Sequence, residues 1–108
     1  MISTNSTKLI VDNGDSVSLT CNGQNNEQIT WIQTINQTGI YFVDVNNTKT
    51  SVLNNGSKLI IDSVNLNDEE YYGCGVLYQN NSFKLLSSYF LYVRGKNILN
   101  IIFSNSLK

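Results

Sequence analysis

Apolar and polar residues alternate along most of this chain, in short runs separated by turn-forming residues. In the run 16–21, the apolar positions are Val17, Leu19 and Cys21, and the positions between them are Ser and Thr. This alternation is typical of a strand that buries one face. The runs recur at the spacing of a two-sheet sandwich. We expect strands over residues 7–11, 16–21, 28–33, 40–45, 48–53, 58–62, 71–78 and 83–93.

The composition favours strands over helices and a single domain over several. The 108 residues include no Ala, which is the best helix former, and many Val, Ile, Thr, Tyr and Phe, which favour strands. This length suits one domain. The chain also has seventeen Asn, one Arg and no Pro. Because Ala, Pro and Arg use GC-rich codons, this bias indicates an AT-rich genome.

Charge and side-chain chemistry argue against several function classes. A net charge of −1 with seven scattered basic residues offers no surface for nucleic acid or an anionic membrane. The chain has no His for general-base or metal chemistry and no Gly-rich phosphate loop. In the one acidic cluster we interpret Asp68 as a corner residue, and Glu69 and Glu70 as solvated turn residues. We expect no enzyme activity, no metal and no cofactor.

Two cysteines permit one intrachain bridge, although in a cytosolic protein they would more simply be buried thiols. Five N-x-S/T sequons favour a secretory compartment instead, even though this Asn content would give roughly three by chance. All five fall in expected loops or at strand ends. We therefore expect a secreted protein or the extracellular face of a membrane protein. The glycosylation candidates are Asn5, Asn36, Asn46, Asn55 and Asn80.

The two ends of the chain differ from the middle. The start lacks the charged and apolar regions of a signal peptide, so we expect a mature ectodomain without its signal peptide or any anchor. No apolar run approaches the roughly 20 residues that span a bilayer, so we expect no direct membrane insertion. We expect a domain over 1–94 and an apolar tail over 95–108, which would dock, self-associate or begin a truncated region.

The motifs around the cysteines resemble those of the immunoglobulin superfamily. The resemblance covers about residues 7–94 and implies an all-β, two-sheet Greek-key sandwich with one inter-sheet disulfide. With room for only two short strands between 33 and 58, the resemblance is to a compact variable-type or intermediate-type domain. The motifs are Leu19-x-Cys21, Trp31, Leu59-x-Ile61-x-x-Val64 and Asp68-x-x-x-Tyr72-x-Cys74.

The resemblance also implies roles for the residues that carry it. Cys21 and Cys74 would form the disulfide, and Trp31 would pack on the sulfurs. Tyr72 would turn into the core and hydrogen-bond to the corner backbone. Asp68 would brace that corner, with Lys49 or Lys58 as its partner. The chain lacks two motifs of antibody domains, the Gly-x-Gly bulge in its last strand and Tyr-x-Gln after the Trp, so antibody-like heterodimers are unsupported.

In this superfamily the sheet that carries the third, fourth, seventh and eighth of these strands commonly presents its outer face to a protein. Alternation from the inward Tyr72 predicts the outward residues of its strand, and the two glycines among them would let a partner approach. We expect Ile32 and Leu77 to be exposed apolar neighbours on this face. The alternative is that they are hydrophobic residues scattered over the surface, as is normal for proteins. The opposite sheet is expected to carry the first strand, with Ser18 on its outer face. The expected binding residues are Ile32, Tyr41, Phe42, Gly73, Gly75 and Leu77.

Three function classes fit these features. The first is a viral immunoglobulin-like glycoprotein that engages a host immune receptor or cytokine. The second is a cellular adhesion or recognition receptor, with homodimers through the sheet face or the tail. The third is a structural module of a longer ectodomain. The AT-rich bias favours the first class, although an AT-rich animal genome would produce the same bias.

Overall fold

The computed structural model describes residues 6–23, 27–36, 38–45 and 47–95, and this part of the chain forms eight strands and one 3-10 helix. The strands make a five-stranded and a three-stranded sheet, which are joined by a disulfide. The expected all-β, two-sheet sandwich is therefore confirmed. The elements are β1 (Thr7–Asp12), β2 (Val17–Thr20), β3 (Thr30–Ile35), β4 (Thr38–Phe42), β5 (Thr50–Leu53), β6 (Lys58–Ile61), η1 (Leu66–Asp68), β7 (Tyr71–Leu77) and β8 (Phe83–Arg94).

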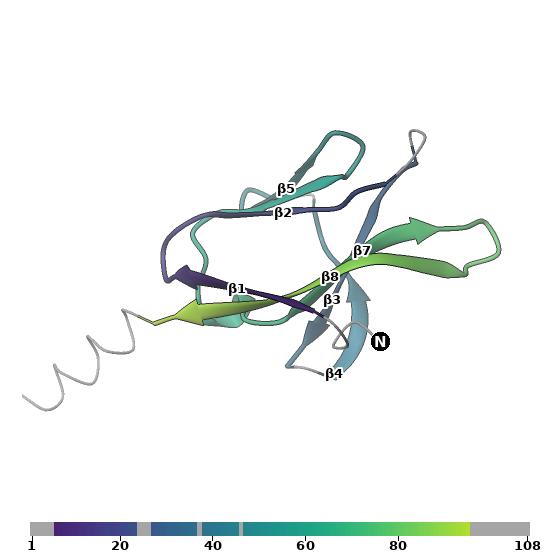
Figure 1. Cartoon of the computed structure of the whole chain (residues 1–108). Helices are drawn as coiled ribbons and strands as arrows, with labels where there is room; N and C mark the ends of the chain where they lie inside the picture. The colour runs from purple at the N-terminus through teal and green to yellow at the C-terminus, as the bar shows by residue number, and fades with distance from the viewer. Residues whose placement is uncertain (1–5, 24–26, 37, 46, 96–108) are drawn as a thin grey trace, which may run out of the picture.

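The order of the strands corrects one expectation. The larger sheet has the order β1-β8-β7-β3-β4 and the smaller one β2-β6-β5 (Figure 1). The first strand was expected beside β2, but β1 instead runs parallel to β8, with Thr7 opposite Tyr89 and Val11 opposite Val93. All other strand pairs are antiparallel. The larger sheet is consequently one strand wider than expected.

The turn after β1 holds this strand against β8. Gly14 has a φ of +95°, a left-handed conformation that favours glycine, and its amide donates to the carbonyl of Val64. At the end of β1, Arg94 forms an ion pair with Asp12 and its backbone carbonyl accepts from the amide of Asn13. The hydrogen bond and charge of Asp12 raise the pKa of Arg94. The ion pair and the Asn13 hydrogen bond join the first strand to the last, and the Gly14 hydrogen bond ties the turn to the segment between β6 and η1.

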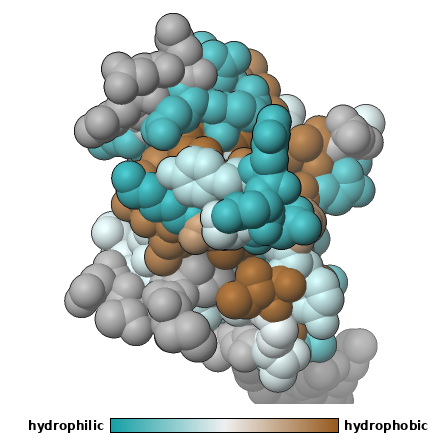
Figure 2. All heavy atoms as spheres, turned by 90° about the vertical axis from the view of Figure 1, so that its right-hand side faces the viewer, coloured by the Kyte–Doolittle hydropathy of each residue, from teal (hydrophilic) through white to brown (hydrophobic). Residues whose placement is uncertain are grey.

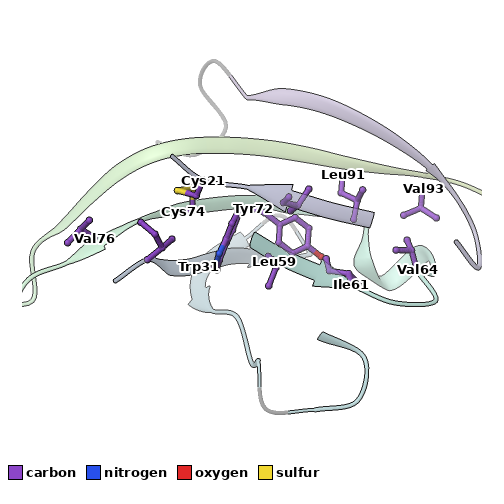
Figure 3. Close-up of a cluster of buried hydrophobic side chains, with 12 residues drawn as sticks. Cys21, Trp31, Leu59, Ile61, Val64, Tyr72, Cys74, Val76, Leu91 and Val93 are labelled. Atoms are coloured by element: carbon purple, nitrogen blue, oxygen red, sulfur yellow. A yellow bond between two sulfur atoms is a disulfide. The ribbon is translucent and has the colours of Figure 1, made fainter. Parts of the chain in front are cut away.

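The core lies between the two sheets and consists of the inward residues of both (Figure 3). In β2 and β6, Leu19 and Leu59 are opposite each other and fully buried. β8 supplies Leu91 and Val93 from the other sheet. Burial of such side chains stabilises the fold by about 1.5–3 kcal/mol each. The buried cluster is Leu19, Cys21, Ile29, Trp31, Leu59, Ile61, Val64, Tyr72, Cys74, Val76, Leu91 and Val93.

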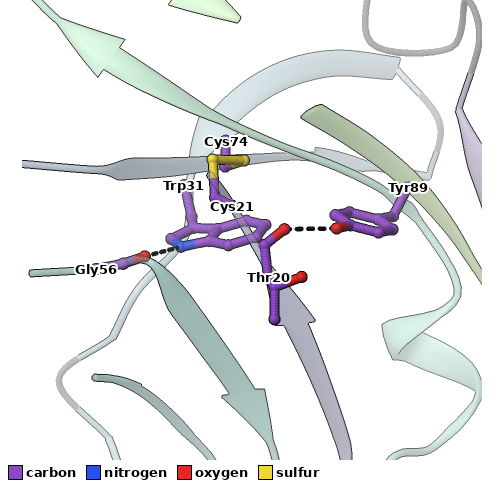
Figure 4. The surroundings of a disulfide bond; sticks show 6 residues. All are labelled: Thr20, Cys21, Trp31, Gly56, Cys74 and Tyr89. Carbon is purple, nitrogen blue, oxygen red and sulfur yellow. Dashed lines mark hydrogen bonds between the residues drawn. A yellow bond between two sulfur atoms is a disulfide. The ribbon is translucent and has the colours of Figure 1, made fainter. Parts of the chain in front are cut away.

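At the centre of the core, the expected disulfide between Cys21 and Cys74 is confirmed, with 6.1 Å between the two Cα atoms. Trp31 lies beside it and is 3% exposed (Figure 4). The indole nitrogen of Trp31 donates to the carbonyl of Gly56, across the sandwich. On its other side the indole stacks on Tyr89, with 6.4 Å between the ring centroids. The disulfide and the indole of Trp31 together join the two sheets.

The corner before β7 is held by side-chain hydrogen bonds. Asn65 caps η1 by accepting from the amide of Asn67, and the carboxylate of Asp68 accepts in return from the amide of Asn65. Asp68 also forms a 2.9 Å ion pair with Lys49. The hydroxyl of Tyr72 donates to the backbone carbonyl of Asp68. The corner thus has a fixed geometry from which β7 begins.

Candidate functional site: the outer face of the larger sheet

The register of the larger sheet decides which side chains share its outer face. Across β4, β3, β7 and β8, the outward row runs from Phe42 through Ile32 and Gly73 to Ser88. Along each strand, the next residue whose side chain faces outward lies two positions away. We define the outer face by the apolar residues and glycines of the outward rows: Ile10, Ile32, Ile40, Phe42, Tyr71, Gly73, Gly75, Leu77, Phe83, Leu85, Phe90 and Tyr92.

Large apolar side chains are concentrated on this face. Of the eleven exposed large hydrophobic residues among those described, six belong to it: Ile10, Ile40, Phe42, Leu77, Leu85 and Tyr92. The outer face of the smaller sheet carries one of them, Leu53. Scattered apolar residues are normal on a protein surface, but their concentration on one of the two sheet faces favours an interaction surface there.

Aromatic contacts order part of the outer face. The rings of Tyr71 and Phe90 meet at 4.6 Å between centroids, tilted by 49°. At the β1 edge, the ammonium group of Lys8 lies 4.9 Å from the centre of the Tyr92 ring. In the described strands, the charged residues of the outward rows are Lys8 and the Asp12–Arg94 pair, all at this edge. The rest of these rows is therefore uncharged, although it includes polar residues such as Thr30 and Ser88.

The prediction that Ile32 is exposed is wrong, because this residue is 8% exposed. It points outward as expected, but it lies on β3, an inner strand with β4 on one side and β7 on the other. A short branched side chain on an inner strand is covered from both sides, here by the strands that carry Phe42 and Gly73. Phe42, in the same row on the edge strand, is 64% exposed. The accessible apolar surface consequently lies toward the edge.

The two candidates from the fourth strand lie on different sides of it. Phe42 is opposite Ile32 and belongs to the outer face. Tyr41 is opposite Gln33 and belongs to the opposite face of the sheet. Tyr41 is 48% exposed because β4 is an edge strand and extends beyond the core. Of the two, Phe42 remains a candidate for the outer face.

The two outward glycines are buried and do not offer an open approach to a partner. A Cβ atom at Gly75 would lie 1.9 Å from the carbonyl oxygen of Lys84 and 2.9 Å from the ring of Phe83. The cause is a bulge at this point, since Cys74 is opposite Ser87 but Gly75 is opposite Leu85. The sequence lacks the Gly-x-Gly motif in the last strand, yet the strand bulges at this point. Because Gly75 has no side chain, the backbone of β8 at Lys84 can pack directly against it.

The acidic residues after Asp68 also differ from expectation, because Glu70 is buried and Glu69 is half-buried. The carboxylate of Glu70 accepts from the hydroxyl of Thr34 and from the amide of Asn36, both at 2.8 Å. Glu69 accepts from the amide of Val93. These carboxylates hold the ends of β3 and β8 beside β7. The sequence hides this role, since Thr34 lies 36 residues from Glu70.

Within the described ranges, the side chains do not form a group of three or more His, Cys, Asp or Glu residues that would hold a metal ion. The part of the chain that the structure describes also includes no helix long and apolar enough to cross a membrane. Burial of the Tyr72 hydroxyl, and then the charges of Asp68 and Glu70, raise the pKa of this residue. Its role is in the core.

Three of the five sequon asparagines lie in described turns. Asn36 is in the β3–β4 turn, Asn55 is in the β5–β6 turn of the smaller sheet, and Asn80 is in the β7–β8 loop. All three are exposed. Asn5 and Asn46, like the tail over 96–108, fall outside the described residues. None of these three asparagines lies within a strand.

The end of the molecule that carries the β7–β8 loop mixes hydrophobic and hydrophilic surface (Figure 2). Leu77 and Tyr78 are exposed here, beside the polar loop that contains Asn80. In that loop the side chain of Asn80 accepts from the amide and the hydroxyl of Ser82. The exposed apolar residues at the end of β7 are therefore bordered by a polar loop.

Comparison with known proteins agrees with this geometry. The sequence profile described as the immunoglobulin domain matches residues 1–76. The chain belongs to the immunoglobulin domain family. A comparison with curated proteins found no match. The matched segment contains both bridge cysteines and Trp31, and it ends within β7.

Proposed function

We propose that this immunoglobulin domain is an extracellular module that binds a protein through the outer face of its larger sheet. The observation that supports this most strongly is the concentration of six exposed large apolar residues on that face, against one on the opposite sheet. Buried apolar and aromatic side chains at the centre of a contact supply most of the energy of protein binding. The uncharged centre and polar rim of this face suit such a contact.

The partner that we propose is a host immune receptor or cytokine, and the domain would belong to a viral glycoprotein. The AT-rich coding bias and the five sequons support this origin. Glycans at Asn36, Asn55 and Asn80 would lie at turns and leave the strands of the outer face free for contact. The first test is a screen of the glycosylated protein against a library of cell-surface and secreted host proteins.

The same screen separates protein binding from a structural role. Wild type and Leu85→Asp are screened in parallel, with Leu53→Asp as the control, because Leu85 and Leu53 are exposed leucines on opposite sheets. A partner that binds wild type and Leu53→Asp but not Leu85→Asp supports the proposal. Binding that survives in Leu85→Asp and is lost in Leu53→Asp would place the contact on the smaller sheet. Sedimentation of wild type alone shows whether the partner is a second copy.

A further inference from the structure

An apolar recess lies beside the outer face, at the side of the sandwich where the edge strands β4 and β5 leave the core open. Its volume is about 390 Å³. Val43, Val45 and Val52 line it and also pack against the core. The remaining lining residues come from the segment just before β3, from the start of β3 and from the outer face: Gln28, Ile29, Thr30, Trp31, Phe42 and Leu77.

The recess is uncharged and mostly apolar. None of its nine lining residues carries a charge, and Gln28 and Thr30 are the polar ones. The buried indole of Trp31 also lines it. Binding sites for small ligands have volumes of about 300–1,000 Å³ and mostly apolar walls. An ionised group would lose its hydration here without gaining a partner of opposite charge, so the chemistry selects a neutral apolar group.

Two residues connect the recess to the outer face. Phe42 and Leu77 line the recess, and both are exposed members of that face. A protein bound across the face would therefore cover the opening of the recess. We propose that the partner inserts one apolar side chain, aromatic or branched, into this recess. This inference rests on the proposed function, because the occupant is part of the partner that the outer face binds.

The recess can be tested without the partner. Toluene is the side-chain analogue of phenylalanine, and Trp31 is the only tryptophan in the chain, so its indole N–H signal in NMR reports occupancy. Protein from the bacterial periplasm would carry the disulfide without N-glycans. We expect toluene to shift the Trp31 signal saturably, with a Kd of about 1 mM. Benzoate, which is charged, should leave the signal unchanged.

Variants locate the binding. Val52→Phe fills the recess and should weaken toluene binding by about ten-fold or more. Leu53→Phe, the next residue on β5, is exposed on the opposite face and should bind toluene as wild type does. Should Val52→Phe not fold, Gln28→Phe places the added ring on the exposed rim instead and should also weaken binding. A Trp31 signal that does not respond to toluene, or responds equally in all variants, overturns the proposal.

The partner assay distinguishes failure of this inference from failure of the proposed function. If Leu85→Asp abolishes partner binding and Val52→Phe weakens it, both proposals hold. If Leu85→Asp abolishes binding and Val52→Phe leaves it unchanged, the outer face binds the partner and the inserted side chain is excluded. If neither variant changes binding, both proposals fail. Leu85 does not line the recess, so the two variants report on separate surfaces.

Discussion

The hydroxyl of Tyr72 donates a 2.8 Å hydrogen bond to the backbone carbonyl of Asp68, four residues earlier. The ring of Tyr72 lies in the core, and the carbonyl belongs to the corner that η1 forms before β7. This bond fixes where β7 begins, and therefore which of its residues face outward. A shift by one residue would exchange the two faces of the strand.

Removal of this hydroxyl gives the first prediction. Tyr72→Phe keeps the ring and loses the bond, so the free energy of unfolding should fall by about 1–3 kcal/mol. Tyr71→Phe, on the outer face, should change it by less than about 0.5 kcal/mol. Urea unfolding of both variants measures the difference. Equal losses in the two variants would show that the bond to Asp68 contributes nothing.

The pH dependence of stability follows from the same residue. Burial raises the pKa of Tyr72 in the folded state above the unfolded value of about 10. The folded state then holds its proton more tightly, so this contribution is complete below about pH 10 and is lost as the pH rises further. Wild type should lose stability between pH 10 and 11.5 more steeply than Tyr72→Phe. Parallel curves would contradict the burial of an ionisable hydroxyl at this site.

The core at the disulfide gives the third prediction. Replacing both Cys21 and Cys74 by Ala should cost about 3–4 kcal/mol, because the bridge closes a loop with a sequence separation of 53 residues. Trp31→Ala should cost about 3–5 kcal/mol, since the core loses its largest ring beside the bridge. Thermal unfolding measures both. A normal melting temperature for Trp31→Ala would contradict its place in the core.

The buried carboxylate of Glu70 gives the fourth prediction. In Glu70→Gln one oxygen still accepts, but the amide group cannot accept from both Thr34 and Asn36. We expect a loss of about 1–3 kcal/mol in urea unfolding. Asp15→Asn, at an exposed turn, is the control and should stay within about 0.5 kcal/mol of wild type. A Glu70→Gln variant with the same free energy of unfolding as wild type would show that the two hydrogen bonds contribute nothing, as for the solvated residue first expected.

Some of these features can be predicted from the sequence, and others depend on contacts between distant residues. Alternation within 71–77 assigns inward and outward residues because the side-chain period of a strand is local. The partners of Glu70 and the neighbour of Gly75 belong to other strands, so no local pattern reveals them. The pairing of β1 with β8 joins residues 82 positions apart, such as Asp12 and Arg94. The exposure of Ile32 likewise depends on its neighbours across the sheet.

The crowding at Gly75 also decides which variants can test binding. Gly75→Arg would force a side chain into the carbonyl of Lys84, so it would disturb the fold and could not report on binding alone. Even Gly75→Ala should cost about 1–3 kcal/mol, the usual range for overpacking. Ser51→Ala, at an exposed position of β5, is the control and should stay within about 0.5 kcal/mol of wild type. A stable Gly75→Ala would show that β8 can move away from β7 at the bulge.

The affinity of the screened partner for wild type, Leu85→Asp and Ser18→Arg tests the central claim most directly. Leu85 is exposed on the outer face of the larger sheet, and Ser18 is exposed on the smaller sheet. Surface plasmon resonance on folded variants should show a loss of at least about 30-fold for Leu85→Asp, as expected for a hot-spot residue, and no change for Ser18→Arg. Loss of affinity in Ser18→Arg alone would contradict the account and assign binding to the smaller sheet.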